Sequence, residues 1–258
     1  MISKIILEAG INHFGKIREA NKILNFFLSS SFQNLTFMIH KKEFYNSQIK
    51  KNKINFYLNK KFYFNALKLA HKKGKKIGLA VCDNQTYDEL KDVNFDFYKI
   101  LGISINNFSL LKKINKKNKN TYISLAIGDD RKIKNCLNYF SNKKKVNLIY
   151  TSMSYDPKDT NLSRISLLKK KFQLPVGYGH HYKNLSTVIL SGFYQPDFYF
   201  FYIKSPTKNK MKIYPDNDHA IFFNKLKNLI DMIKETSYLV KNKNINTKIK
   251  LNANKIKR

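Results

Sequence analysis

Several residue types that build particular classes of protein are scarce in this sequence. It contains no tryptophan, 5 prolines, 9 glycines and 2 cysteines in 258 residues. Two isolated cysteines exclude a disulfide framework and a cysteine-based metal site, because each of these needs several cysteines at set spacings. We therefore expect Cys82 and Cys136 to be buried thiols.

Long apolar runs are also missing. No stretch approaches the roughly 20 apolar residues that a membrane-spanning helix needs. The opening residues, MISKIILEAG, lack the long apolar segment and the small-residue cleavage site of a signal peptide. At 43% apolar residues the chain is nevertheless too hydrophobic to be disordered. We therefore expect a soluble, cytoplasmic protein with a substantial core.

Acidic residues are few, with 17 Asp and Glu against 49 Lys and Arg, and the formal net charge is +32. A positive excess of this size is typical of nucleic-acid-binding proteins. Here, however, just 4 of the basic residues are arginine, and lysine lacks the planar fork that reads a base edge. We interpret the charge as the result of an AT-rich coding sequence and do not expect a nucleic-acid partner.

Short apolar runs alternate along the chain with longer amphipathic stretches, in which apolar residues recur every three or four positions as in a helix. Eight strand-like runs, each followed by a helix-like segment, favour a single-domain α/β fold, the (β/α)8 or TIM barrel. A doubly wound open sheet is the alternative. The runs are Lys4–Ala9, Leu35–Ile39, Ile77–Val81, Phe95–Leu101, Tyr122–Ile127, Val146–Tyr150, Leu174–Tyr178 and Phe198–Ile203.

Two segments interrupt this alternation. His40–Lys60 is a polar and aromatic insertion after the second predicted strand, on the side where the loops of a barrel build its binding site. Residues 242–258 are rich in Lys and Asn and poor in apolar residues, which predicts a basic, disordered tail. The predicted barrel domain therefore covers residues 1–241.

Several short motifs resemble those of one known family and follow the family's order. Residues 8–15 read EAGINHFG and resemble the E-x-G-x-N-H-x-G motif of the sialic acid synthase family. Residues 98–100 (YKI) and 106–108 (NNF) resemble its Y-K-I and N-N-Y segment. Residues 176–181, VGYGHH, resemble its V-G-x-S-D-H turn, and residues 214–219, YPDNDH, resemble its G-P-D-H segment.

The resemblance implies a barrel that condenses phosphoenolpyruvate with an amino-sugar aldehyde, commonly N-acetylmannosamine, to give a nine-carbon sugar acid for surface polysaccharides. It also implies help from a divalent metal ion, Mn²⁺ or Mg²⁺, and it is compatible with a homodimer. The small C-terminal antifreeze-like domain of family members has no match in these 258 residues.

The resemblance also assigns roles to individual residues. Glu8 and Lys99 match candidate catalytic positions, Lys99 on the phosphate side, and His181 matches one of two metal-binding histidines. Candidate substrate contacts are Asn12, Ser124, Tyr155 and one of two aspartates, Asp216 or Asp218, between which the motif does not choose.

Other positions depart from the family pattern, and each replacement is neutral or apolar. The family's second-strand lysine falls at Phe37, a glutamate falls at Ser104, and a loop asparagine falls at Met153. The second metal-binding histidine falls at Tyr202 and a nearby glutamate at Phe200. These departures raise an alternative, a catalytically degenerate homologue that binds a sugar or phosphate or depends on a partner.

Two further alternatives concern the remaining polar residues. His180, His181 and His219 form another metal set if the loops bring them together, since loop histidines can act as ligands. Glu8 and Lys99 each stand in an apolar strand-like run, where a charge needs a partner. A Glu8–Lys99 ion pair with a purely structural role is therefore the alternative to a catalytic one.

Overall fold

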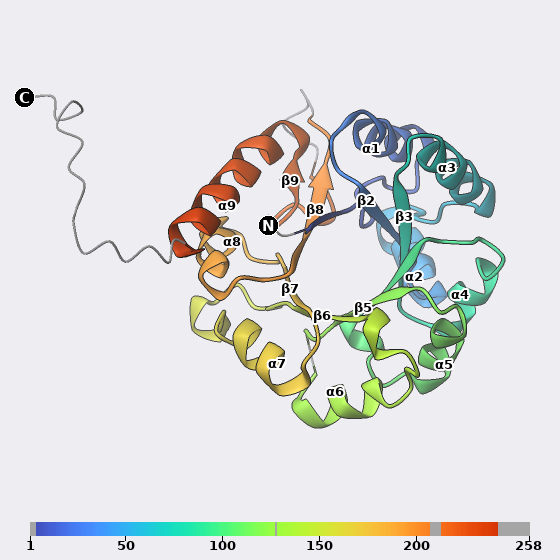
Figure 1. The fold of residues 1–258 in the computed structure, drawn as a ribbon. Helices are drawn as coiled ribbons and strands as arrows, with labels where there is room; N and C mark the ends of the chain where they lie inside the picture. Colours follow the sequence, from blue (N-terminus) through green and yellow to red (C-terminus); the bar gives the residue numbers. More distant parts are fainter. Residues whose placement is uncertain (1–3, 127, 207–212, 242–258) are drawn as a thin grey trace, which may run out of the picture.

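A computed structural model describes residues 4–126, 128–206 and 213–241 of the chain, so the predicted tail at 242–258 lies outside the described residues. Eight parallel strands form a closed barrel inside a ring of helices (Figure 1). This arrangement confirms the predicted TIM barrel and rules out the open sheet. The strands are β1 (Lys4–Glu8), β2 (Asn34–Met38), β3 (Lys76–Val81), β4 (Phe97–Ile100), β5 (Asn120–Ser124), β6 (Val146–Tyr150), β7 (Val176–Gly179) and β8 (Phe198–Lys204).

The barrel closes because β8 pairs in parallel with β1 as well as with β7. The register of β1 and β8 sets Lys4 opposite Phe198 and Glu8 opposite Tyr202. A ninth strand, β9 (Ile221–Phe222), pairs in parallel with the end of β8 and was not predicted. Every predicted apolar run overlaps one of the eight barrel strands, because buried parallel strands read as continuous apolar segments.

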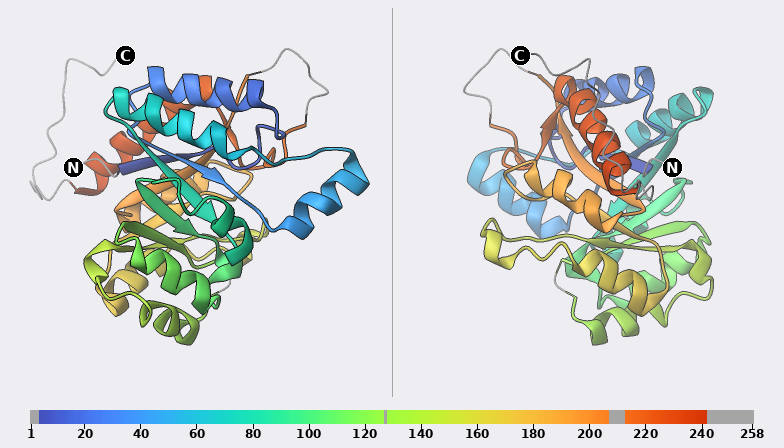
Figure 2. Two further views of the ribbon diagram at one scale, coloured as in Figure 1. Left: turned by 90° about the vertical axis from the view of Figure 1, so that its right-hand side faces the viewer. Right: turned by 60° about the vertical axis from the view of Figure 1, so that its left-hand side comes forward.

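Helices follow the strands as the amphipathic pattern predicts. In the segment 40–60 the predicted insertion contains a helix, α2, which stands away from the ring of helices (Figure 2). No helix in the described ranges is long and apolar enough to cross a membrane. The helices are α1 (Ile17–Ser29), α2 (Lys42–Asn52), α3 (Lys60–Lys72), α4 (Asn84–Glu89), α5 (Phe108–Lys116), α6 (Asp130–Leu137), α7 (Arg164–Phe172), α8 (Ser186–Ser191) and α9 (Leu226–Lys241).

The barrel interior is filled with side chains. One buried cluster consists of Ile6, Phe97, Tyr122, Ile149, Phe198 and Phe200. Gly78 and Gly177 make room for it, since a Cβ atom at either position would collide with the ring of Phe97 or Phe198. The interior is therefore a packed core, and the polar residues lie at the carboxyl ends of the strands.

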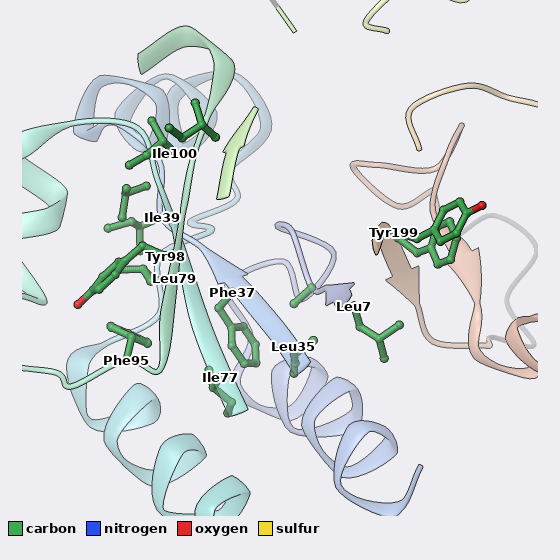
Figure 3. Packing of buried hydrophobic residues seen from close by; sticks show 14 of the residues in the cluster. Leu7, Leu35, Phe37, Ile39, Ile77, Leu79, Phe95, Tyr98, Ile100 and Tyr199 are labelled. Carbon is green, nitrogen blue, oxygen red and sulfur yellow. The ribbon is translucent and has the colours of Figure 1, made fainter. Parts of the chain in front are cut away.

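The larger buried cluster lies between the strands and the helices. Phe37 belongs to this layer, beside Leu35 and Ile77 (Figure 3), and its ring contacts that of Phe62 on α3 at 5.1 Å. Because side chains alternate across a strand, the neighbours of Phe37 face the barrel interior instead. Phe37 therefore packs against the helices and does not fill the site inside the barrel.

Candidate functional site

A buried ion pair lies at the carboxyl end of the barrel interior, which we call the Glu8–Lys99 site. Lys99 Nζ donates a hydrogen bond to Glu8 Oε2 at 2.5 Å, and the two side chains are 5% and 3% exposed. The ammonium group also lies 4.9 Å from the ring centre of Phe200 and 5.5 Å from that of Tyr202. Burial raises the pKa of Glu8, and the Lys99 charge lowers it in part. Each charge therefore depends on the other for its place in the core.

Three rings stand next to this pair. The imidazoles of His181 and His219 stack with centroids 4.3 Å apart, and the ring of Tyr202 meets them edge-on at 5.1 and 5.0 Å. His219 Nε2 lies 3.9 Å from the carboxylate of Asp216. Residues from the ends of β1, β4, β7 and β8 thus gather in one place, where TIM-barrel sites are built.

Burial shifts the pKa values of Asp216, His219 and His181. Burial and the nearby Glu8 raise the pKa of Asp216 to about 7, and the Lys99 charge opposes this rise. Burial lowers the pKa of His219 to about 4, and it lowers the pKa of His181 well below its usual value. At neutral pH the imidazoles are therefore uncharged, and Asp216 is poised to take or give a proton.

Asn12 fixes the loop that carries Asp216. Its Nδ2 group donates to the carbonyl of Ile203 at 3.0 Å, and its Oδ1 atom accepts the backbone N–H of Asp216 at 3.1 Å. Asp218, by contrast, is 51% exposed and approaches Lys183 at 4.0 Å. Of the two aspartates that the motif left open, Asp216 is the one inside the site.

Gly10 allows the Asp216 carboxylate and the Tyr202 ring to lie close to the backbone of the loop after β1. Its φ of +53° suits glycine, and a Cβ atom there would collide with the Asp216 carboxylate and the Tyr202 ring.

The remaining predicted substrate contacts lie at the rim. Tyr155 is 42% exposed, its hydroxyl lies 3.4 Å from His219 Nδ1, and Lys183 covers its ring at 5.0 Å. Ser124 is buried at the end of β5. Met153 is 58% exposed and does not fill the site, whereas Phe200 and Tyr202 do lie in it.

Buried polar atoms without partners also mark this edge of the barrel. In the described part of the chain they are His13 Nε2, Asn84 Oδ1, His180 Nδ1, Asp216 Oδ2 and His219 Nε2. All five belong to segments that follow a strand, at the carboxyl edge. Buried polar atoms are normally satisfied, so a polar ligand or ordered water is expected there. The sequence analysis did not single out Asn84, because one asparagine at the start of a helix has no distinctive sequence signal.

The residues present do not fit a divalent metal ion. His181 and His219 stack with their planes 24° apart, so their nitrogens do not converge on one point. The ring of His180 is turned toward Phe201 in the outer layer, so the three histidines do not form a set. Within residues 4–126, 128–206 and 213–241, no group of three or more His, Cys, Asp or Glu side chains is placed to hold a metal.

A second region of the same edge is open, and we call it the β5–β6 hollow. It has a volume of about 830 Å³ and lies between the segments that follow β5 and β6. Asp130 in its wall pairs with Arg164 at 3.6 Å and also with Lys171. Its other polar lining includes Asp129, Arg131, Thr151 and Ser152.

Comparison with known proteins gives one family and several similar folds. The model of the NeuB family matches residues 24–244. The N,N'-diacetyllegionaminic acid synthase of Campylobacter jejuni is 26% identical over 204 residues, which are 70% of this chain and 61% of that protein. The chain thus spans about three fifths of the length of this curated relative.

Two solved structures have the same fold. The N-acetylneuraminic acid synthetase of Leptospira borgpetersenii superposes with a TM-score of 0.79 at 21% identity, covering 95% of this chain and 87% of that one. The spore coat polysaccharide biosynthesis protein spsE of Bacillus subtilis gives a TM-score of 0.77 at 20% identity, covering 92% and 69%.

Proposed function

The chain belongs to the NeuB family, and from this membership we propose that it acts in the synthesis of nine-carbon sugar acids, as a sialic or legionaminic acid synthase-like protein. The observation that carries the proposal is the position of Glu8, Lys99 and Asp216 together at the carboxyl end of the barrel. Buried carboxyl groups with a raised pKa, as at Glu8 and Asp216, are typical of catalytic sites.

The proposed reaction joins a three-carbon donor to a six-carbon acceptor. A bond forms between C3 of phosphoenolpyruvate and the aldehyde carbon of an amino sugar, water adds at C2 of the donor, and phosphate leaves. Lys99 binds an anionic oxygen of the donor, because an ammonium group is a strong partner for carboxylate and phosphate.

Asp216 and His219 are the groups that take part in proton transfer. Asp216, whose pKa is raised to about 7, exchanges a proton with the sugar near neutral pH. The neutral imidazole of His219 offers an unpaired Nε2 atom for a hydrogen bond. Tyr155 and Ser124 contact the substrate from the rim.

A second candidate function is favoured by the aromatic rings. Phe200 and Tyr202 stand where the resemblance expects a glutamate and a histidine, and they enclose Lys99. On this alternative the barrel is a non-catalytic homologue that keeps a sugar or phosphate pocket, or that works with a partner.

The test follows phosphate release from phosphoenolpyruvate with N-acetylmannosamine or a diacetamido hexose, with Mn²⁺ in one series and EDTA in the other, beside an active synthase. The synthase function is supported if phosphate is released only when the sugar is present, and if the rate of release falls about 10²-fold or more in Lys99→Met. No release, with either substrate raising the melting temperature, favours the binding protein. No release and no binding contradict both.

A further inference from the structure

The Glu8–Lys99 site already holds a fixed cation. The Lys99 ammonium group lies against Glu8, Phe200 and Tyr202. The ring of Tyr202 in turn meets the imidazoles of His181 and His219 edge-on, with centroids 5.1 and 5.0 Å away. The ammonium group therefore stands among the residues that the resemblance connects with a metal ion.

The neighbours of Lys99 are poor metal ligands in this arrangement. Tyr202 lies 5.1 Å from His181, ring to ring, where the resemblance expects the second histidine. A divalent ion beside His181 would also be repelled by the ammonium group, and repulsion between like charges is strong where water is excluded.

Lys99 also keeps capacity to bind a ligand. An ammonium group has three N–H donors. Glu8 accepts one of them, and within the described ranges no second hydrogen-bond acceptor is recorded for Lys99 Nζ. The rings of Phe200 and Tyr202 hold the charge by cation–π attraction, which is compatible with hydrogen bonds from the remaining donors to ligand oxygens.

We propose that Lys99 is the resident cation of this site, that it takes the place of a divalent metal ion, and that it binds the carboxylate or phosphate oxygens of the ligand directly. Ligand binding is then independent of metal. The proposal rests on the proposed function for the choice of phosphoenolpyruvate as a probe, whereas the metal-binding measurement below is independent of it.

The first experiment titrates Mn²⁺ into the metal-free protein and follows free Mn²⁺ by electron paramagnetic resonance. We expect no saturable binding by the wild type or by Tyr202→His, and one bound ion per chain in Tyr202→His/Lys99→Met, once circular dichroism shows that it is folded. Saturable binding by the wild type that His181→Ala abolishes would overturn the proposal. So would equal Mn²⁺ binding by Tyr202→His and the folded double variant.

The second experiment measures phosphoenolpyruvate binding by calorimetry, with EDTA or with Mn²⁺. We expect the same Kd within about twofold, and a Kd at least about tenfold weaker in Lys99→Met. The matched control is Lys75→Met, because Lys75 is also buried but donates hydrogen bonds to the carbonyls of Phe27 in α1 and Phe32 after it, at the opposite edge of the barrel.

Two results would contradict the proposal: binding at least about tenfold tighter with Mn²⁺, or unchanged binding in Lys99→Met. If the wild type does not bind phosphoenolpyruvate in either buffer, the proposed synthase function is contradicted. The Mn²⁺ titration alone then tests whether Lys99 takes the place of a metal ion.

Discussion

The Glu8–Lys99 site and the β5–β6 hollow lie at the same edge of the barrel and contain the same kinds of charge. In the first, the paired side chains are 3% and 5% exposed. In the second, Asp130, Arg164 and Lys171 are 42%, 41% and 46% exposed. Water therefore screens the charges of the hollow and leaves those of the buried pair unscreened.

This difference shows why the open volume is a poor guide to the site. The hollow is large, but its charges need no explanation beyond a solvated surface. The buried pair needs a reason, because a hydrophobic pair of similar size is often at least as stable as a buried ion pair. The unpaired atoms of Asp216 and His219 point to the same place.

The largest change in stability is expected when one member of the buried pair is removed. We expect Glu8→Gln to lower the free energy of unfolding by about 3–5 kcal/mol, because it leaves the Lys99 charge buried without a partner. Lys99→Met should cost less, because Glu8 can take up a proton once its partner is gone. Urea denaturation measures both.

The double variant Glu8→Gln/Lys99→Met is the control for this effect. It should be more stable than Glu8→Gln, since no charge is left buried. A loss below about 1 kcal/mol in Glu8→Gln would mean that water reaches the pair, as it does in the hollow.

A second, smaller effect comes from Asp216. Its pKa is about 7 in the folded protein, against 3.8 for an ordinary aspartate. Between these values the folded state keeps a proton that the unfolded state has lost, so this group's contribution to stability falls as pH rises, by about 1.4 kcal/mol per unit. Asp216→Asn does not titrate, so it should gain about 2–3 kcal/mol relative to the wild type between pH 5 and 7.

The buried histidines provide the internal control for that measurement. Burial lowers the pKa of His13 to about 4 and that of His180 to about 3, so their contribution to stability is lost as pH falls from the usual histidine range. That effect has the opposite sign and is present in both proteins, so it cancels in the difference. Parallel stability curves from pH 5 to 7 would show that Asp216 is solvated.

The sequence predicted the fold from the alternation of apolar runs and amphipathic stretches, and it predicted the buried pair from two charges inside those runs. A charge inside an apolar run must find a partner, and Glu8 and Lys99 are both in such runs. The sequence did not show which face of its strand Phe37 occupies, because a mostly apolar run has no alternation that marks an inner and an outer face. Asp216 and Asp218 could not be separated either, because the choice depends on how Asn12 holds a loop distant in sequence.

The smallest effect is expected in the β5–β6 hollow. Arg164→Ala removes the 3.6 Å contact with Asp130, but both side chains are more than 40% exposed. Exposed pairs of this kind contribute about 0–1 kcal/mol, so urea denaturation should show a change in that range. Raising the salt concentration should abolish the difference from the wild type, because mobile ions screen exposed charges. A loss as large as that in Glu8→Gln, retained at high salt, would place Arg164 in a second buried site and remove the contrast between the two regions.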